Sequence, residues 1–249
     1  MKVSIITITY NSAETVEDTI KSVLSQDYQN IEYIIIDGAS RDNTLSIISH
    51  YKNKVSILVS EPDKGIYDAM NKGLSLAKGD IIGLLNSDDV YAHASVISNM
   101  VDKLKEKEAD AVYGDLVYVD RKMEKVIRYW KAGEYTKGLF LKGWMPPHPT
   151  FFVKKYVYDK LGLFNLQLKS SADYELMLRF IHKGNIIVVY LPEVMVKMRT
   201  GGQSNVTLRN RIKANQEDRL AWKLNGLSPT PFTLILKPLM KARQFFLKK

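Results

Sequence analysis

The sequence predicts an α/β fold with a mostly parallel central sheet and helices on both of its faces. Through the first 110 residues, short runs rich in Val and Ile alternate with amphipathic segments, the order expected of strands joined by crossover helices. The run from Ile81 to Leu85 has no polar side chain, as in a strand that is buried on both faces. We therefore expect a single domain, with a smaller and less regular region after residue 110.

Strands are expected where the β-branched residues gather, and helices where apolar residues recur every three or four positions. In the first half, this predicts strands at 3–9, 31–36, 55–59 and 81–85 and helices at 42–51, 66–77 and 94–104. Asn11 and Glu14 have the spacing of a capping box. A helix is therefore also expected soon after the first strand, with one buried face formed by Ala13, Val16, Ile20, Val23 and Leu24.

The pattern changes beyond Ala111. Two extended segments, Ala111–Val119 and Lys125–Trp130, precede a turn-rich stretch that contains His148. Helical periodicity returns at 172–182, where the apolar face is formed by Leu176, Met177, Phe180 and Ile181. We divide the chain into two halves of one domain, residues 1–110 and 111–205, and a basic helical tail, residues 206–249.

Composition limits the classes of protein that fit the chain. Its 249 residues are 45% hydrophobic and 25% charged, which is enough for a full core and too well mixed for a disordered chain. No apolar run approaches the roughly 20 residues that span a bilayer, and no secretory leader precedes Val3. We therefore expect a protein of the cytosol or of a membrane face. Because cysteine is absent, carboxylate, histidine and carbonyl groups are the metal ligands available.

Most of the net charge of +9 lies in the C-terminal tail. From Asn205 onward, ten Lys and Arg residues stand against two acidic residues. Such a tail suits nucleic acid, anionic lipid or a phosphorylated substrate, and it suits a solvated surface equally well. From Pro231 to Lys249, large apolar residues are interleaved with cations. This stretch either lies on an anionic membrane or packs its apolar side on the domain.

Polar and acidic side chains follow the four expected strands of the first half. Ligands of open α/β sheets collect at the carboxyl ends of the strands, because loops and helix N-termini converge there. The segments at these ends are Tyr10-Asn11, Asp37-Gly38, Glu61-Pro62-Asp63 and Asn86-Ser87-Asp88-Asp89. Carboxylates in three of the four segments suit a site for a base, a ribose and a metal. Gly-rich phosphate loops of the GxGxxG and GxxxxGK[ST] types are absent, which argues against dinucleotide enzymes and P-loop ATPases.

Three candidate groups have both a functional and a structural interpretation. Asp88 and Asp89 are hard oxygen donors at a strand end and could hold Mg²⁺ or Mn²⁺, although such residues also cap helices. Asp173, in the first turn of a helix, is held ionised by the helix dipole, as a general base requires, or is only a favourable first-turn charge. His148 could bind a metal or a phosphate, or could be structural.

With these pieces identified, residues 1–205 resemble the family 2 glycosyltransferases. The resemblance implies the GT-A fold, a Rossmann-like sheet flanked by helices with a smaller acceptor-side region. It places the nucleoside at Thr9, Tyr10 and Asn11, the base at Asp37, and the metal motif at 86–89. It further implies that Asn86 and Ser87 contact the donor, that Asp88 and Asp89 bind the metal, that Asp173 is the catalytic base, and that a late loop closes over the donor through Arg199, Gly202 and Ser204.

The chain departs from the family pattern at two positions. Asn86 replaces the first aspartate of the Asp-x-Asp motif, so Asp88 becomes the main metal ligand. Met70 stands where many members carry an arginine that meets the diphosphate, and Lys64, Lys72 or Arg199 is expected to supply that charge. The block from Pro62 to Gly73, in which Asn71 is also expected at the donor, is similar to the subgroup of capsule, exopolysaccharide and colanic-acid-type transferases.

By this resemblance, we expect an inverting glycosyltransferase of hexosyl or N-acetylhexosaminyl type. It would move a sugar from a nucleotide-diphosphate donor to an acceptor hydroxyl, with Mn²⁺ or Mg²⁺ as cofactor, during surface polysaccharide or glycolipid assembly. The expected acceptor is a glycan or a lipid-linked sugar, and the expected location is the cytoplasm or the inner face of the cytoplasmic membrane.

Two other functions fit parts of the pattern. A sugar-nucleotide nucleotidyltransferase uses a similar sheet, but it carries a Gly-rich signature where this chain has Thr9-Tyr10-Asn11-Ser12. A noncatalytic GT-A-like binding protein is disfavoured because Asp88, Asp89 and Asp173 are all retained. Nucleic acid is not an expected partner, since acidic strand ends repel a phosphate backbone.

Overall fold

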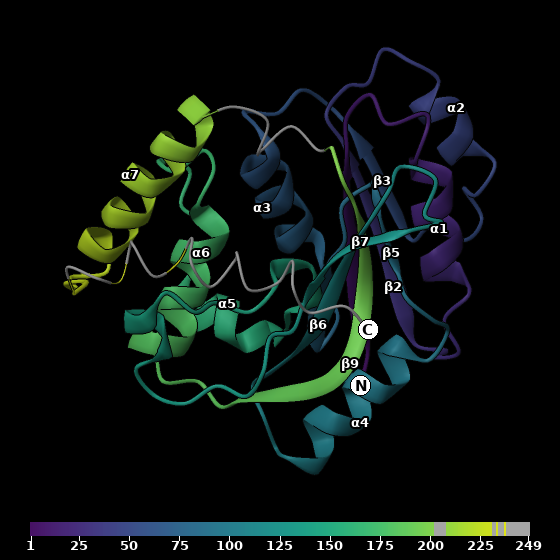
Figure 1. Ribbon diagram of the computed structural model, residues 1–249. Coiled ribbons are helices and arrows are strands. Elements are labelled where there is room, and N and C mark those ends of the chain that lie inside the picture. Colours follow the sequence, from purple (N-terminus) through teal and green to yellow (C-terminus); the bar gives the residue numbers. More distant parts are fainter. Residues whose placement is uncertain (202–207, 231–232, 234–236, 238–249) are drawn as a thin grey trace.

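The computed structural model confirms the α/β fold and describes residues 1–201, 208–230, 233 and 237, with the side chains of 208–213 not described (Figure 1). One nine-stranded sheet runs through the molecule in the order β3-β2-β1-β4-β8-β6-β9-β5, with β7 beside β6. Its strands are β1 (Val3–Thr9), β2 (Ile31–Asp37), β3 (Ile57–Ser60), β4 (Ile81–Leu84), β5 (Asp89–Tyr91), β6 (Ala111–Val119), β7 (Val126–Trp130), β8 (Phe152–Lys154) and β9 (Val188–Arg199).

The first four strands are parallel neighbours, as the alternating pattern predicts. Thr9 pairs with Asp37 and Asp37 pairs with Ser60, so the carboxyl ends of β1, β2 and β3 lie at one edge of the sheet. Strand β4 pairs with the other side of β1 in the same direction. All seven residues of β1 are buried, including the polar residues Ser4, Thr7 and Thr9.

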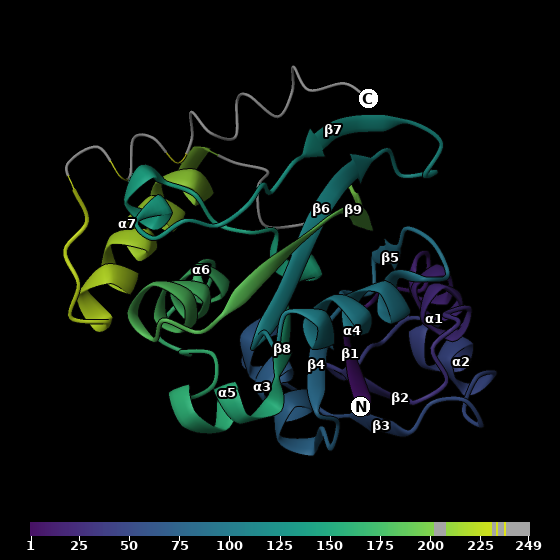
Figure 2. The same cartoon turned by 90° about the horizontal axis from the view of Figure 1, so that it is seen from below.

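Helices cover both faces of the sheet (Figures 1 and 2). Val16, Ile20 and Ile48 belong to the core on one face, and Met70, Phe180 and Trp222 belong to the core on the other. The first face carries α1 (Val16–Leu24), α2 (Thr44–Ser49) and α4 (Val96–Glu106), and the second carries α3 (Ile66–Leu76), α5 (Lys155–Leu161), α6 (Ala172–Met177) and α7 (Leu208–Leu224).

The predicted capping box of the first helix is wrong. Asn11 has a left-handed backbone, with φ 47°, and its Oδ1 accepts a hydrogen bond from the Arg41 backbone at 2.9 Å. Helix α1 begins only at Val16, and its N-cap residue Thr15 makes no side-chain cap. The Asn11 side chain therefore links the loops after β1 and β2 instead of capping the helix. Ala13, expected on the buried face of the helix, precedes its first residue.

The second half of the chain contains elements that its sequence pattern does not show. Strand β9 runs parallel to β6 and then antiparallel to β5, although Pro192 and Glu193 interrupt its apolar pattern. The helix expected at 172–182 changes after Met177 into a π-helical turn, η3 (Leu178–Lys183). Its predicted apolar face is nevertheless buried throughout: Leu176, Met177, Phe180 and Ile181.

Helix α7 packs on the domain. Its Ala221 and Trp222 are buried in the same core as α3 and α6. Beyond it, Thr233 donates a hydrogen bond to the Leu141 carbonyl at 2.7 Å, and Lys237 pairs with Asp218 at 2.7 Å. These contacts favour packing over membrane binding for residues 233 and 237, and the rest of the stretch from 231 onward lies outside the described residues. No helix in the described part of the chain has the length and apolarity needed to cross a membrane.

Candidate active site

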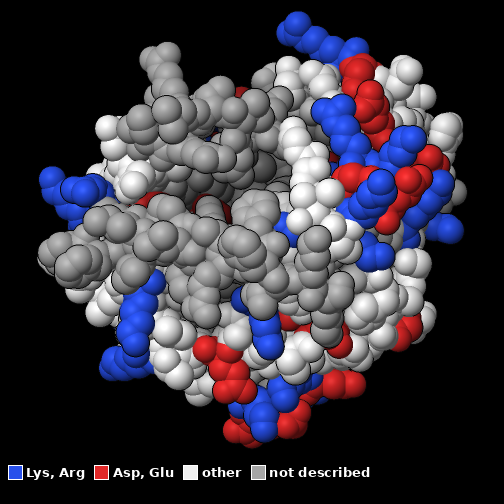
Figure 3. Space-filling model, viewed as in Figure 1, with Lys and Arg blue, Asp and Glu red and all other residues white. Residues whose placement is uncertain are grey.

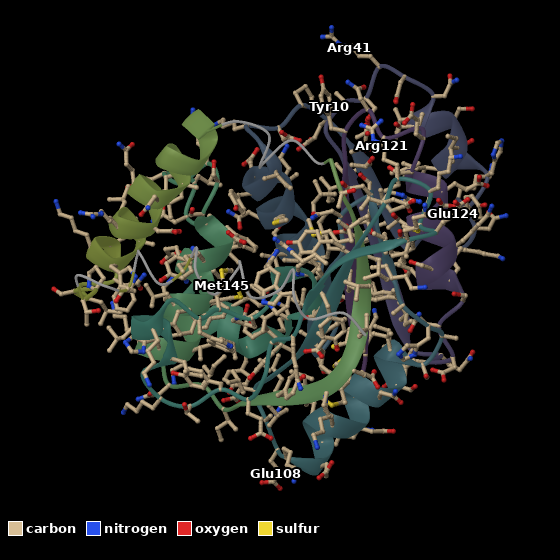
Figure 4. All side chains as sticks on the ribbon, viewed as in Figure 1. Tyr10, Arg41, Glu108, Arg121, Glu124 and Met145 are labelled. Atoms are coloured by element: carbon tan, nitrogen blue, oxygen red, sulfur yellow. The ribbon has the colours of Figure 1, made fainter. Side chains whose placement is uncertain are left out.

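The polar loops that follow β1, β2 and β4 are joined to one another. The backbone N–H of Asn11 donates a hydrogen bond to Ser40 Oγ at 2.8 Å, and Ser87 Oγ donates one to Ser12 Oγ at 2.8 Å. Tyr10, which is 55% exposed, lies at the opposite end of the molecule from Glu108, which follows α4 (Figure 4). The site thus forms at the sheet edge that the strand ends predict.

Asp37 shapes the loop after β2. It is fully buried, and its carboxylate accepts hydrogen bonds from the backbone N–H of Ser40 at 3.0 Å, from Ser40 Oγ at 2.5 Å and from Ser60 Oγ at 2.6 Å. With both oxygens engaged inside the protein, Asp37 holds the loop 38–40 in place in this structure. Thr9 is also buried, with 1% of its surface exposed.

Asp63 is the carboxylate that approaches this loop from outside. A Cβ atom added to Gly38 would lie 2.5 Å from Asp63 Oδ2 and 3.4 Å from the Tyr10 ring. Glycine at position 38 therefore lets Asp63 and Tyr10 come close to the backbone. Asp63 is partly exposed, so it can meet a ligand at this end of β2 where Asp37 is enclosed.

Asp88 and Asp89 form an acidic pair at the start of β5: Asp88 is half-buried and Asp89 is fully buried. Asp89 is 0% exposed, and neither of its carboxylate oxygens has a hydrogen-bond partner among the described residues. Burial raises its pKa well above the usual aspartate range, and the Asp88 charge adds to that rise. Burial also raises the pKa of Asp88, against the opposing charge of Arg199. A buried carboxylate with a second carboxylate as its neighbour in sequence is a place where a bound cation would be stabilising.

The donor set at 86–89 fits a hard divalent ion. Within the described ranges, no cluster of three or more His, Asp or Glu side chains is arranged to hold a metal by itself. Mg²⁺ and related ions are commonly held by one or two carboxylates, with the remaining ligands supplied by water and substrate phosphates. Asp88 and Asp89 supply two such carboxylates, and the Asn86 side chain lies close enough to Asp89 to lower its pKa.

Arg199 fastens three segments around this pair. Its guanidinium donates to Asp18 Oδ2 at 2.5 Å, to the Asp88 carbonyl at 3.1 Å and to the Arg121 carbonyl at 3.2 Å. Only 8% of Arg199 is exposed. In this structure Arg199 is thus a buried residue that holds the backbone at Asp88. The family resemblance predicts a different role, in a loop that closes over the donor.

The lysine and asparagine expected at the diphosphate are also held by protein groups. Lys72 Nζ lies 2.8 Å from Glu61 and 2.8 Å from the Pro62 carbonyl, and it ties α3 to the loop after β3. Asn71 bonds both backbone groups of Phe164, each at 2.9 Å. Lys64 is exposed, so of the three expected cations it is the one that extends into solvent.

Asp173 lies in the first turn of α6, on the face shared with α3. Tyr67 Oη donates to Asp173 Oδ1 at 3.1 Å, and burial together with the Asp173 charge raises the pKa of Tyr67 well above its usual value. His148 packs edge-on against Phe164 at 5.7 Å. Burial lowers the pKa of His148, and the nearby Asp173 charge opposes that shift. Asp173 is therefore flanked by a phenol and by an imidazole that favours its neutral form.

Tyr118 of β6 lies near the acidic pair through the pairing of β6, β9 and β5. Both the Asp89 charge and the Asp173 charge raise the pKa of Tyr118, after burial as the main cause. Tyr118 pairs with Met198 across β6 and β9, and Met198 pairs with Asp89 across β9 and β5, so these side chains lie on one face of the sheet. The guanidinium of Arg128 stacks 3.7 Å above the Tyr118 ring. Tyr118 thus lies near Asp89 in the sheet and has Arg128 stacked on its ring.

The sequence pattern does not mark Tyr67, Tyr118 or Arg128 as site residues, whereas Asp63 belongs to one of the acidic strand-end segments that it predicts. Tyr67 and Tyr118 occupy positions that read as core in a helix and a strand, and no local signal marks their hydroxyl groups. Arg128 follows from the pairing of β7 with β6, which a linear pattern does not reveal. Gly202 and Ser204, expected in a loop over the donor, lie outside the described residues.

Comparison with known proteins identifies the class of this fold and site. Residues 4–162 match the family model of Glycosyl transferase family 2. A glycosyltransferase of Mycobacterium tuberculosis is 33% identical over 186 residues, which cover 71% of this chain and 68% of that protein. A PGL/p-HBAD biosynthesis glycosyltransferase of Mycobacterium bovis is 28% identical over 207 residues, covering 81% and 78%. The chain belongs to glycosyltransferase family 2, and it is an enzyme of that class.

Solved structures show the same fold. The crystal structure of Staphylococcus aureus TarS 1–349 in complex with UDP-GlcNAc has a TM-score of 0.71 at 17% identity, over 100% of this chain and 73% of that one. The mannosyltransferase PcManGT from Pyrobaculum calidifontis, in complex with GDP-Man and Mn²⁺, has a TM-score of 0.67 at 22% identity, covering 98% and 69%. The GT-A fold is thereby confirmed, and the nucleotidyltransferase alternative is not supported.

Proposed function

We propose that this enzyme is an inverting glycosyltransferase that transfers a hexosyl or N-acetylhexosaminyl group from a nucleotide-diphosphate donor to an acceptor hydroxyl. The observation that carries the proposal is the gathering of polar and acidic groups at the carboxyl ends of the parallel strands, where Asn11 bonds to Ser40 and Ser87 bonds to Ser12. Asp88 and Asp89 follow β4 at this edge, and Asp173 is held by Tyr67 of the helix that follows β3. The donor-bound neighbours TarS and PcManGT support a nucleotide sugar as substrate.

In this proposal, the loops after β1 to β4 bind the nucleotide. The exposed ring of Tyr10 and the partly exposed Asp63 meet the base and ribose, and Asp37 keeps the loop between them in shape. Asp88, Asp89 and Asn86 would hold Mn²⁺ or Mg²⁺, which when bound neutralises charge on the departing diphosphate. Lys64 supplies a cation at the exposed side of the same edge.

Asp173 accepts the proton of the acceptor hydroxyl as that oxygen attacks the anomeric carbon. The bond from Tyr67 Oη holds one carboxylate oxygen, so the other oxygen is available for the acceptor. His148, favoured in its neutral form, adds no positive charge beside this carboxylate. Inversion follows because a single attack opposite the leaving group needs no covalent intermediate.

The biological setting belongs to the same proposal. The relative named for PGL/p-HBAD biosynthesis supports a glycolipid acceptor, and the block from Pro62 to Gly73 supports surface polysaccharide assembly. Work at the inner face of the cytoplasmic membrane would suit a lipid-linked acceptor. Positive and negative side chains intermix at the right side and along the lower edge of the view in Figure 3, among the residues that are described.

The test begins with donor identification. Thermal-shift screening against UDP, GDP, dTDP and CMP, each with and without Mn²⁺, is expected to show stabilisation by one nucleotide only when metal is present. Sugar nucleotides of that base are then assayed for transfer and hydrolysis by mass spectrometry. Stabilisation that is equal with and without metal would contradict the proposed role of Asp88 and Asp89.

The role of Asp173 is tested with D173N. Because a positioned base typically contributes about 10² to 10⁴ in rate, D173N should lose at least about 10² in kcat while keeping its donor affinity. D159N is the matched control, since Asp159 pairs with Lys155 on α5 and is 61% exposed. Equal turnover in D173N and D159N would remove Asp173 from the mechanism.

A further inference from the structure

Glu217 of α7 binds the backbone that leads into the helix of Asp173. Its Oε2 atom accepts three hydrogen bonds, from the N–H groups of Lys169 at 3.1 Å, Ser170 at 2.7 Å and Ser171 at 3.0 Å. Ser171 is the N-cap residue of α6, and its own side chain makes no cap. The N–H groups around the start of a helix lack acceptors within the helix. Here the Glu217 carboxylate of another helix is their acceptor.

Other α7 groups hold the residues on either side of Asp173. Ser171 Oγ donates to the Ala214 carbonyl at 3.3 Å, and Trp222 Nε1 donates to Tyr174 Oη at 2.9 Å. On the next residue, Asn225 Nδ2 donates to Glu175 Oε1 at 3.0 Å. Positions 171, 174 and 175 are thus fixed by α7, while Asp173 itself is bonded from the opposite side by Tyr67.

These contacts determine where α6 begins and in which direction its first turn points. Asp173 projects from that first turn, so a shift of the segment 169–171 moves its carboxylate. Glu217 accepts through a charged oxygen, and hydrogen bonds to charged groups are shorter and stronger than neutral ones. Displacement of a reacting group by about 1 Å can cost about 10² in rate. The connection therefore has the strength and the location to affect catalysis.

We propose that Glu217 is a positioning residue for the catalytic base, and that α7 is a brace for the acceptor side of the site. Glu217 acts through the backbone of 169–171 and touches neither donor nor acceptor. The proposal rests on the role of Asp173 given above. It assigns a function to a segment that lies outside the family match at residues 4–162 and that sequence reasoning treats as a basic tail.

The experiment measures kcat, donor KM and donor affinity in E217Q, which keeps the length of the side chain and removes its charge. We expect kcat to fall about 10-fold to 100-fold, within the range known for misplaced catalytic groups, with donor KM and affinity unchanged. The amides of 169–171 should also lose protection from hydrogen exchange, whereas the amides of β1 and β4 keep theirs. If E217Q only lost stability, the fraction of folded enzyme would fall, and donor binding and turnover would decrease in the same proportion.

E32Q is the matched control. Glu32 is likewise a carboxylate that anchors backbone, since it accepts bonds from the Lys78 N–H at 2.7 Å and from Ser4 Oγ at 2.6 Å. It lies near the start of β2, at the edge of the sheet away from the strand-end loops. E32Q should lower the unfolding midpoint and leave kcat of the folded enzyme unchanged.

The outcomes separate this proposal from the function on which it rests. If the full chain transfers no sugar from any donor, the proposed function fails; if D173N is inactive while E217Q has the kcat of E32Q, the brace fails and the function stands. Should E217Q not fold, S171A removes one bond to α7 and is expected to lower kcat selectively, in the same direction. Full kcat in S171A together with unchanged exchange at 169–171 would then overturn the proposal.

Discussion

Replacement of Arg199 by alanine should destabilise the protein far more than removal of its ionic partner. Arg199 is 8% exposed, whereas Asp18 is 51% exposed. An exposed carboxylate in an ion pair contributes about 0 to 1 kcal/mol, so D18A should cost no more than that. R199A also leaves the Asp88 and Arg121 carbonyls without their charged donor. Each of these two hydrogen bonds contributes about 1 to 1.5 kcal/mol, and the ion pair with Asp18 adds about 0 to 1 kcal/mol. R199A should therefore lower the free energy of unfolding by about 2 to 4 kcal/mol.

The two variants are compared by urea unfolding, followed by tryptophan fluorescence, in chelator and then in Mn²⁺. R199A should also weaken Mn²⁺ affinity, because the Asp88 backbone is no longer fixed, and R199K should recover only part of the stability since one ammonium cannot replace the guanidinium fork. Equal destabilisation by D18A and R199A would show that the ion pair, and not the anchoring of two carbonyls, is the main contribution.

Three further predictions concern the acidic pair, the base and the sheet. The pKa of Asp89 is raised in the folded protein, so above the usual aspartate range the folded state binds more protons than the unfolded chain. The free energy of unfolding of the metal-free protein therefore falls as pH rises. D89N should be about 1 to 3 kcal/mol more stable than the wild type at neutral pH and no more stable than the wild type in acid. Y67F should lower kcat about 10-fold, the value of one hydrogen bond, at constant donor affinity by calorimetry. G83A should cost about 1 to 3 kcal/mol in urea unfolding, because its Cβ would lie 2.3 Å from the Phe152 ring.

The parallel part of the fold follows from the sequence because its signals are local. A buried strand such as β1 is rich in β-branched residues, and that enrichment is visible in the sequence itself. Strand β9 could not be predicted in this way, since its pairing with β6 and β5 is long-range and its middle carries Pro192 and Glu193. The capping-box error at Asn11 has the same origin, because its side chain bonds to the loop after β2 instead of to its own helix.

The candidate site likewise contains residues that a local sequence pattern predicts and residues that only long-range contacts reveal. Asp88, Asp89 and Asp173 could be proposed from the sequence, because carboxylates at a strand end and in a first helical turn have a recognisable chemistry. Glu217 gives no such signal, since a glutamate in a basic, weakly amphipathic helix reads as solvated surface. Its role depends on a contact between residues 46 to 48 positions apart, which only the packing of α7 on α6 establishes.

The central claim is that the metal-binding pair and Asp173 belong to one site, and paramagnetic broadening tests it directly. A 4-fluorophenylalanine at Phe164, beside Tyr67 and His148, gives a fluorine signal next to the base. Mn²⁺ with the stabilising nucleotide should broaden this signal, while Mg²⁺ with the same nucleotide leaves it sharp and D88A removes the effect of Mn²⁺. A sharp signal in the wild-type protein with Mn²⁺ demonstrably bound would contradict the account.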